Sequence, residues 1–372
     1  MRSNVEWLES LELFGMELGL ERMRALLAEL GDPQGAYPAV HVVGTNGKTS
    51  TTRLTADLLA AEGLSVGAYI SPHVTGWSER IRVAGEEADF DEAIGFVRPA
   101  AELVRATQFE VVTAAALATF ADAGVDAAVV EAGLGGRLDA TNVLNAPVVV
   151  LTNVALEHTE HLGSTREAIA AEKLAVIRPG AAVVLGEAEW AEAARSRGAG
   201  EVVFAGASNT ALALAAAEAF LGRPVSVRPE IVDVPGRLER VGDAPLEIWD
   251  GAHNPAALGY LLPRLPARSD WVLVLSILAD KDVEAMLAAF SALGSQLVAT
   301  TSRHPRALGA EELADRARHL FATVEPVDDP VQAVSRGREL AGTEGAVLVS
   351  GSLYLLAAVR SSYVPWDTPA SG

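Results

Sequence analysis

Two kinds of hydrophobic pattern alternate along this chain of 372 residues. Short apolar runs are typical of buried strands, and longer stretches with apolar residues at helical spacing are typical of amphipathic helices. Strands that alternate with helices favour a mostly parallel sheet with helices on both faces. In the first part of the chain we expect strands at 39–43, 64–70, 126–131, 147–152, 182–186 and 201–205, and helices at 16–30, 49–61, 90–106, 112–123, 165–176 and 209–221.

A second series of the same kind follows. Between the two series, residues 233–245 are rich in turn formers and charge, as expected of a connection between domains. We therefore predict an α/β protein with an N-terminal domain over 1–240 and a smaller, Rossmann-like domain over 241–372. The expected elements of the second domain are strands at 245–250, 271–276, 296–301 and 346–350, and helices at 254–264, 283–293, 310–320, 330–341 and 352–360.

A glycine-containing loop connects the first expected strand to the helix at 49–61. In a strand, glycine loop and helix, backbone N–H groups and the helix N-terminus converge on nucleotide phosphates. Lys48 would reach the terminal phosphates, and Thr49 or Ser50 would offer a hydroxyl to Mg²⁺. Val42 stands where the full Walker pattern has a glycine, so an ordinary glycine turn is the alternative. The candidate phosphate-binding residues are Gly44, Thr45, Asn46, Gly47, Lys48, Thr49 and Ser50.

The charge balance narrows the range of partners. The chain carries 29 basic and 49 acidic residues, a formal net charge of -20, which argues against nucleic acid or an anionic membrane as a partner. It has no cysteine, which excludes disulfides and thiolate metal sites. No N-terminal segment has the pattern of a signal peptide, and no apolar run reaches the length of a membrane span. We expect a cytoplasmic protein with neither nucleic-acid nor membrane partners.

Ser71, Glu131 and His158 each lie at or after the carboxyl end of an expected strand. Open α/β sheets bind ligands at this edge, and a carboxylate such as Glu131 suits Mg²⁺. Each residue also has a structural interpretation: a Ser-Pro turn, a turn or cap carboxylate, and a structural histidine. Lys173 lies in an expected helix and, considered alone, has the pattern of a solvated lysine.

In the second domain, Asp250, His253 and Asn254 lie at an expected strand-to-helix turn. The Asp250 carboxylate could hold a nucleotide ribose, or it could cap the helix that opens at Pro255. Two further polar clusters, at 280–282 and 303–306, follow strands and are also compatible with ordinary loop chemistry.

Together these segments resemble the folylpolyglutamate synthase / dihydrofolate synthase family, a branch of the Mur ligase superfamily of ATP-dependent amide-bond ligases. The Mur enzymes carry a nucleotide-sugar-binding domain ahead of the loop, and the residues that precede Gly44 are too few for it, so we expect the folate branch. The matching stretches run in the family's order: Gly44 to Ser50, Ser71 to His73 with Glu79 to Ile81, Thr107 to Glu110, Glu131 to Asn142, Leu156 to Thr159, Glu172 and Lys173, Pro235 to Arg237, Asp250 to Pro255, and Asp280 to Asp282.

Two positions depart from the family pattern. The family usually has glycine directly after its loop lysine, whereas this chain has Thr49 there, as the Mur enzymes do. Thr49 and Ser50 are therefore both candidates for the metal contact. Gln108 stands where the family often has an aromatic residue, in a segment that the resemblance implies to touch the pterin.

The resemblance implies a Mur-ligase-type N-terminal domain and ATP bound between the two domains. Members of the family transfer the γ-phosphate of ATP to a substrate carboxylate, and the glutamate amine then displaces phosphate from the acyl phosphate. The implied cofactors are Mg²⁺ at two sites and a monovalent cation, with ATP as co-substrate. The implied partners are L-glutamate and dihydropteroate or reduced folates, and we expect a monomer.

The resemblance also implies roles for individual residues. Lys48, Lys173 and His158 would be catalytic. The metal ligands would be Thr49, Ser71, Glu131, His158 at a second site, and Lys173 as a carbamate formed with CO₂. Beyond the loop, ATP would contact Asn209, Arg237 and, through its ribose, Asp250. The substrates would contact Thr107, Gln108, Phe109, Glu110, Leu138, Asp139, Ala140 and His253.

The leading hypothesis is a bifunctional ligase that joins L-glutamate to dihydropteroate and then extends folates. A member of the family that makes only one of these products is an alternative. Another is a nucleotide-binding regulator without ligase activity, against which the joint presence of Lys48, Glu131, His158, Lys173 and Asp250 argues. A P-loop transporter or motor would need membrane or nucleic-acid features that the sequence lacks.

Overall fold

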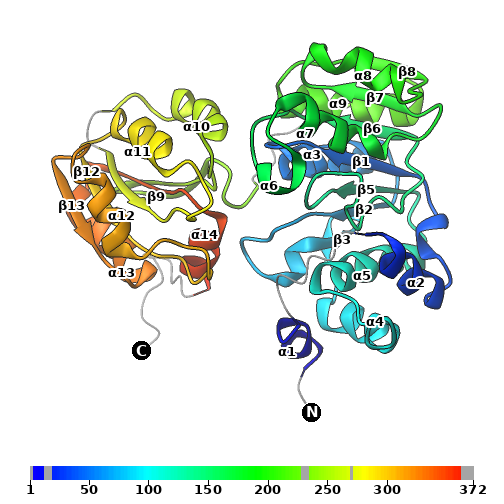
Figure 1. The fold of residues 1–372 in the computed structure, drawn as a ribbon, viewed down its shortest axis with the longest axis horizontal. Coiled ribbons are helices and arrows are strands. Elements are labelled where there is room, and N and C mark those ends of the chain that lie inside the picture. Colours follow the sequence, from blue (N-terminus) through cyan, green and yellow to red (C-terminus); the bar gives the residue numbers. More distant parts are fainter. Residues whose placement is uncertain (1–2, 12–18, 228–233, 269–270, 362–372) are drawn as a thin grey trace. The chain divides into compact units, whose positions relative to one another are not determined.

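The computed structural model describes residues 3–11, 19–227, 234–268 and 271–361 (Figure 1). Contacts divide the chain into two compact units. The first contains Met1–Pro72 and Trp77–Val232, and the second contains His73–Gly76 and Asp233–Gly372.

The first unit is built on an eight-stranded sheet with the order β4-β3-β2-β5-β1-β6-β7-β8. All neighbours from β2 to β8 are parallel, whereas β3 pairs antiparallel with β2 and β4. The carboxyl ends of the parallel strands therefore meet at one edge. The strands are β1 (Ala39–Val43), β2 (Val66–Tyr69), β3 (Ile81–Val83), β4 (Glu86–Glu87), β5 (Ala127–Glu131), β6 (Val148–Leu151), β7 (Ala182–Leu185) and β8 (Glu201–Phe204).

Helices cover both faces of this sheet (Figure 1). Alternate residues of each buried strand face opposite layers: Val40 and Val42 of β1 pack with α3 (Lys48–Ala61) and α9 (Asn209–Leu221). On the other face, Ala39 packs in the cluster of α4 (Phe90–Val104) and α5 (Gln108–Asp122), and Val43 in the cluster of α7 (Arg166–Lys173) and α8 (Ala191–Ser196). The remaining helices of this unit are α1 (Asn4–Glu9), α2 (Glu21–Glu29) and α6 (Thr159–Leu162).

The second unit has a six-stranded sheet with the order β13-β12-β11-β14-β10-β9. Only β9 is antiparallel to its neighbour. Helices α10 to α12 cover one face, and α13 and α14 cover the other, where Val74 is also buried. The elements are β9 (Glu239–Asp243), β10 (Leu246–Trp249), β11 (Trp271–Leu275), β12 (Gln296–Ala299), β13 (Thr323–Pro326), β14 (Ala346–Ser350), α10 (Pro255–Leu261), α11 (Val283–Ser291), α12 (Ala310–Ala317), α13 (Pro330–Ala341) and α14 (Leu353–Arg360).

The predicted α/β class with mostly parallel sheets is confirmed, and every predicted strand is present with ends shifted by at most a few residues. The expected helix at 16–30 corresponds to α2, and residues 12–18 lie outside the described ones. The pattern did not predict β3, β4, β9, β13, α1, α6 or α8. These elements are short, and β4, β9 and β13 have exposed or half-buried, partly charged residues, so they lack a continuous apolar run.

Candidate functional site

The loop predicted to bind phosphate, residues 44–50 and named the phosphate loop below, turns between β1 and α3 at two glycines with positive φ. Gly44 has φ 148° and Gly47 has φ 81°. A Cβ on Gly44 would lie 1.8 Å from Thr152 Oγ1, and one on Gly47 would lie 2.4 Å from Asn209 Oδ1. Glycine is therefore required at both positions on steric grounds. The same contacts place Asn209, the first residue of α9, against the loop.

A second segment, which follows β6, holds the phosphate loop in shape. Asn153 accepts hydrogen bonds from the backbone N–H groups of Thr45 and Asn46, at 2.9 Å and 3.0 Å. Thr152 Oγ1 donates to the Asn46 carbonyl at 2.7 Å. We did not predict Thr152 and Asn153 as site residues, although a Thr-Asn pair directly after a buried strand is a signal that could have found them.

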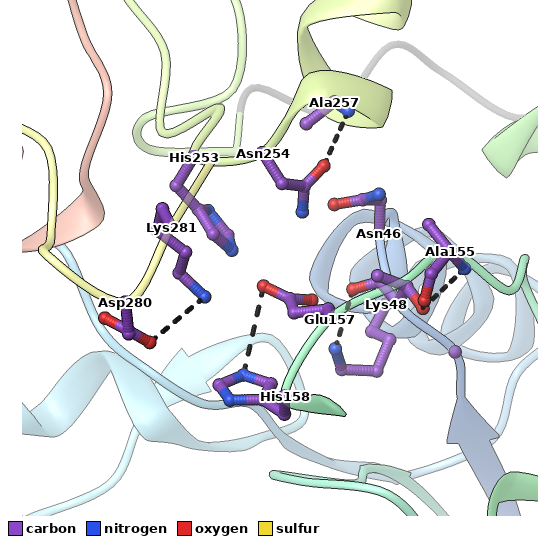
Figure 2. Close-up of polar contacts among 12 residues, drawn as sticks. Asn46, Lys48, Ala155, Glu157, His158, His253, Asn254, Ala257, Asp280 and Lys281 are labelled. Carbon is purple, nitrogen blue, oxygen red and sulfur yellow. Dashed lines mark hydrogen bonds and ion pairs between the residues drawn. The ribbon is translucent and has the colours of Figure 1, made fainter. Parts of the chain in front are cut away.

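Lys48 opens α3, and its side chain bends back over the loop. Its Nζ donates to the carbonyl oxygen of Thr45 at 3.1 Å (Figure 2). The side chain of Thr45 in turn accepts a hydrogen bond from the N–H of Ala155 at 3.0 Å. The loop lysine is thus held close to the backbone that would surround a phosphate.

Glu131, at the end of β5, meets two of the predicted metal-binding positions. Its Oε1 accepts a hydrogen bond from Thr49 Oγ1 at 3.1 Å, and its Oε2 accepts one from the N–H of Ser71 at 3.2 Å. The side chain is 2 % exposed and does not cap a helix. Of the two candidate hydroxyls, that of Thr49 donates to Glu131.

Lys173 is buried, which contradicts its interpretation as a solvated helix lysine. It is 4 % exposed, and its Nζ donates to the Gly44 carbonyl at 2.7 Å. Burial, followed by repulsion from Lys48, lowers the pKa of Lys173 from 10.5 to about 7. Single-sequence periodicity missed this burial because the residue ends an amphipathic helix and its partner is distant in the chain.

A cavity of about 30 Å³ lies beside the phosphate loop. His158 reaches it from the start of α6, where its φ is 50°, and its Nε2 lies 3.9 Å from Glu157 Oε1 (Figure 2). Three predicted catalytic residues, Lys48, His158 and Lys173, therefore line one cavity. The other lining residues are Gly44, Thr45, Gly133, Leu134, Gly135, Glu157 and Leu162.

The predicted substrate segment at 107–110 forms the start of α5. Thr107 and Glu110 make a capping box, and Glu110 also pairs with Arg22 at 2.7 Å. The Thr-x-x-Glu spacing is the sequence signal for this helix start, so our expected start at residue 112 was late. Gln108 donates to the Leu8 carbonyl at 3.1 Å.

Phe109 is the member of that segment that meets the glycine loop after β5. A Cβ on Gly133 would lie 2.4 Å from Phe109 Cζ, so the ring lies directly against the loop backbone. Its centroid is 6.5 Å from that of Tyr69. The Phe109 ring therefore borders the loop. It supplies an aromatic surface in a segment where Gln108 stands at the position that is often aromatic in the family.

Asp139 is buried in the same glycine loop. Its carboxylate accepts hydrogen bonds from the N–H of Leu134 at 2.7 Å and from the N–H and hydroxyl of Thr141 at 3.0 Å and 2.5 Å. Burial raises the pKa of Asp139, while these hydrogen bonds and the charge of Lys48 oppose the rise. Of its neighbours, Ala140 is buried and Leu138 is half-buried.

In the second unit, Asp250 follows β10 and is nearly buried. Its carboxylate accepts hydrogen bonds from the N–H groups of Leu238 and Ala252, both at 2.8 Å. Burial raises the pKa of Asp250, and the charge of Arg237 is the largest opposing influence. The helix cap is instead Asn254, which accepts from the Ala257 N–H at 2.8 Å (Figure 2).

Two other predicted positions of this unit lie in its strand-end loops. His253 Nδ1 lies 2.8 Å from the Gly251 carbonyl oxygen. Asp280 pairs with Lys281 at 3.8 Å (Figure 2) and with Arg306 at 3.0 Å. The polar clusters at 280–282 and 303–306 are therefore joined by an ion pair.

Two negative findings concern the part of the chain that the structure describes. Within it, no group of three or more His, Asp or Glu side chains is arranged to hold a metal ion. No helix within the described ranges is both long and apolar enough to cross a membrane.

Two family models match successive parts of this chain, one in each unit of the structure. The Mur ligase middle domain matches residues 42–223, and the Mur ligase glutamate ligase domain matches residues 236–353. A dihydrofolate synthase/folylpolyglutamate synthase of Escherichia coli is 34% identical over 96% of this chain and 94% of its own length. A protein of the same description from Mycobacterium tuberculosis is 33% identical over 92% of this chain and 90% of its own length.

Solved structures of related enzymes share the whole fold. An E. coli structure in complex with DHPP and ADP has a TM-score of 0.87 at 32% identity and covers 97% of both chains. A structure of a bifunctional folylpolyglutamate synthase/dihydrofolate synthase with Mn, AMPPNP and L-glutamate bound also has a TM-score of 0.87 at 32% identity, over 97% of this chain and 98% of its own.

Proposed function

Because the chain belongs to the dihydrofolate synthase/folylpolyglutamate synthase family of Mur ligases, we propose that it joins L-glutamate both to dihydropteroate and to folates. Membership makes the chain an ATP-dependent ligase. The observation that carries the proposal is that Lys48, His158 and Lys173 line one cavity at the phosphate loop. The ligands in the related structures, a nucleotide, DHPP and L-glutamate, support the same set of substrates.

The proposed reaction has two steps. A carboxylate oxygen of the pterin or folate attacks the γ-phosphorus of ATP, and ADP leaves. The amine nitrogen of L-glutamate then attacks the acyl carbon, loses a proton and expels phosphate, so that an amide remains. Phosphoryl transfer depends mainly on positioning and on cations near the charged oxygens. Lys48 is the residue that we assign to the transferred phosphate.

Nucleotide binding is assigned mainly to the phosphate loop. The N–H groups between Gly44 and Ser50 and the N-terminus of α3 would face the phosphates, with Asn209 lying against Gly47. In the second unit we assign Arg237 to ATP, Asp250 to the ribose and His253 to the substrates. Both Asp250 oxygens already accept hydrogen bonds from backbone N–H groups. The carboxylate is therefore oriented before the ribose binds.

The donor set around Glu131 fits a hard divalent cation. A buried carboxylate in contact with the Thr49 hydroxyl and the Ser71 backbone offers oxygen ligands, which Mg²⁺ prefers. When bound, Mg²⁺ would neutralise charge on the β- and γ-phosphates. A second Mg²⁺ would use His158 and Lys173, and Lys173 fits it as a carbamate because its low pKa leaves much of the amine uncharged near neutral pH. The Mn in a related structure supports a divalent cation.

The pterin is assigned to the segments 107–110 and 138–140. Phe109 supplies a flat apolar surface, and Asp139 supplies a buried hydrogen-bond acceptor. We further propose that a monovalent cation assists the reaction and that the enzyme acts as a monomer.

A panel of substrates tests this proposal. Product formation and phosphate release are measured with ATP and L-glutamate plus dihydropteroate, dihydrofolate or tetrahydrofolate in turn. The bifunctional assignment predicts ATP-dependent products with dihydropteroate and with tetrahydrofolate. Product with only one of them would support a monofunctional enzyme. Nucleotide binding without any product would support a regulator.

A further inference from the structure

His41 is a buried polar residue in the central strand of the first unit, shortly before the phosphate loop. It is 1 % exposed, while its strand neighbours Val40 and Val42 face the opposite layer of helices. Burial, with a smaller effect of Arg178, lowers the pKa of His41 to about 3. The imidazole is thus neutral at physiological pH, and a buried polar ring requires a hydrogen-bond partner.

That partner is Thr141, which connects the histidine to Asp139. His41 Nε2 lies 2.8 Å from Thr141 Oγ1, which lies 2.5 Å from Asp139 Oδ1. The backbone N–H of Thr141 donates to the same carboxylate oxygen at 3.0 Å. A continuous chain of hydrogen bonds therefore leads from β1 to the glycine loop that we assign to the pterin.

The direction of this chain follows from counting hydrogens. The Thr141 hydroxyl has one hydrogen, and an ionised carboxylate can only accept. When Asp139 is ionised, the hydroxyl hydrogen must therefore point to it. His41 Nε2 must then carry the hydrogen that reaches the Thr141 oxygen, which requires the Nε2–H tautomer of His41.

The Asp139 carboxylate retains room for one further donor. A carboxylate offers about four acceptor positions. Oδ1 accepts two hydrogen bonds from Thr141, and Oδ2 accepts one from the N–H of Leu134. The remaining position is on Oδ2, and its direction is set by the three bonds that fix the carboxylate plane. The polar edge of a pterin ring carries N–H groups of the kind that this position accepts.

On the basis of the proposed function, we propose that His41 and Thr141 are positioning residues for the pterin. They hold the Asp139 carboxylate so that its remaining acceptor position meets a ring N–H. Neither residue touches the substrate. Their loss would weaken pterin binding and leave nucleotide binding unchanged, whereas a purely structural role would affect both substrates or neither.

Thr141→Val tests this inference, because it removes the hydroxyl and keeps the side-chain volume. Dihydropteroate affinity is measured by calorimetry, and the KM values for dihydropteroate and ATP by phosphate release. We expect the Kd and KM for dihydropteroate to rise about tenfold, as for the loss of one hydrogen bond to a charged group, and the KM for ATP to change less than about twofold. Thr141→Ser, which keeps the hydroxyl, should bind dihydropteroate within about threefold of wild type.

The histidine is tested by a matched pair. His41→Met removes the N–H and should weaken dihydropteroate binding as Thr141→Val does, whereas His41→Gln keeps an N–H donor and should restore part of the affinity. The double variant His41→Met/Thr141→Val should bind dihydropteroate as tightly as whichever single variant binds it less tightly, because both changes break the same chain of hydrogen bonds. Thr119→Val is the control, since Thr119 donates to the Ala115 carbonyl at 2.8 Å within α5. Unchanged dihydropteroate affinity in Thr141→Val, or an equal rise in the KM for ATP, would overturn the inference.

Nitrogen-15 NMR of the wild-type protein gives an answer that does not depend on any variant folding. We expect His41 to be the Nε2–H tautomer at neutral pH. Observation of the Nδ1–H tautomer would contradict the proposed chain of hydrogen bonds. If the wild-type enzyme adds glutamate to no pterin or folate, the proposed function fails, while the tautomer and the calorimetric affinity for dihydropteroate still decide this inference.

Discussion

The ammonium group of Lys173, at the end of α7, donates a hydrogen bond to the carbonyl oxygen of Gly44, the first residue of the phosphate loop, at 2.7 Å. This contact holds the amine in the cavity that Lys48 also lines. Burial and the nearby charge of Lys48 lower the pKa of Lys173 to about 7. A neutral amine can attack CO₂, giving a carbamate and a released proton, so the contact prepares Lys173 for the role that we propose.

Lys173→Ala should lower kcat at least about a hundredfold, comparable with the loss of one group that stabilises transition-state charge. Acetate or formate should restore part of the activity by supplying carboxylate oxygens in the vacated space. Phosphate release with dihydropteroate, ATP and L-glutamate measures both effects. Arg318→Ala, which removes an exposed arginine from the second unit, serves as the control.

Carbon-13 NMR separates the carbamate from other roles of Lys173. Wild-type protein supplied with ¹³C-bicarbonate should show a carbamate signal that Lys173→Ala lacks. A wild-type protein without this signal, or a fully active Lys173→Ala enzyme, would refute the carbamate.

The low pKa of Lys173 also predicts a pH dependence of stability. Its pKa is about 7 in the folded protein and about 10.4 in the unfolded chain. Between these values the unfolded chain binds more protons at this site, so the free energy of unfolding should rise with pH. Below pH 7 both states are protonated, and the cost of the buried charge is present in full.

Lys173→Met removes this titration and measures its contribution. Urea unfolding of protein free of metal and bicarbonate, at several pH values, gives the difference in unfolding free energy between wild type and variant. The wild type should gain relative to the variant from about pH 7 to 10. A difference that is constant over this range would show that the pKa of Lys173 is not lowered in the folded protein.

The second lysine of the cavity gives a kinetic prediction. Lys48→Ala should reduce kcat about a hundredfold to a thousandfold without unfolding the protein, because a half-buried loop lysine contributes little to packing. Circular dichroism and thermal melting check the fold, and phosphate release checks turnover. A folded Lys48→Ala protein with near-normal phosphate release would remove the phosphate-loop assignment.

Gly136 lies against the backbone at the end of α7. A Cβ at this position would lie 2.7 Å and 2.8 Å from the carbonyl oxygens of Glu172 and Lys173. Gly136→Ala should therefore displace the end of α7, lower kcat, and destabilise the protein by about 1–3 kcal/mol. Gly35→Ala is the matched control, since a Cβ there meets nothing within 4 Å. Equal thermal stability and activity of the two variants would contradict this packing.

The sequence predicted the buried strands well and the edge strands poorly. The apolar run at 346–350 became β14 with the same ends, because a parallel strand covered on both faces is apolar at every position. Strand β9 contains Glu239, Arg240 and Asp243 and lies at the edge of its sheet, where charged residues are favoured. Such a strand is recognised only from its pairing with β10.

The candidate site was predicted in the same uneven way. Thr49 was identified in the glycine loop, and Ser71 and Glu131 at strand ends. The structure brings Thr49 and Ser71 into contact with Glu131, while the metal-binding roles stay predictions. Asn153 and Gly136 were not singled out, because their contacts are with residues distant in the chain. Periodicity describes which face a residue occupies and carries no information about such long-range contacts.

The proposal that this ligase forms an acyl phosphate is tested most directly by following an oxygen isotope. Dihydropteroate labelled with ¹⁸O in its carboxylate is incubated with the enzyme, ATP and L-glutamate, and the released phosphate is examined by mass spectrometry. The account predicts one ¹⁸O atom in each phosphate, because the carboxylate oxygen that attacks the γ-phosphorus leaves with it. Unlabelled phosphate released together with the glutamylated product would contradict the account.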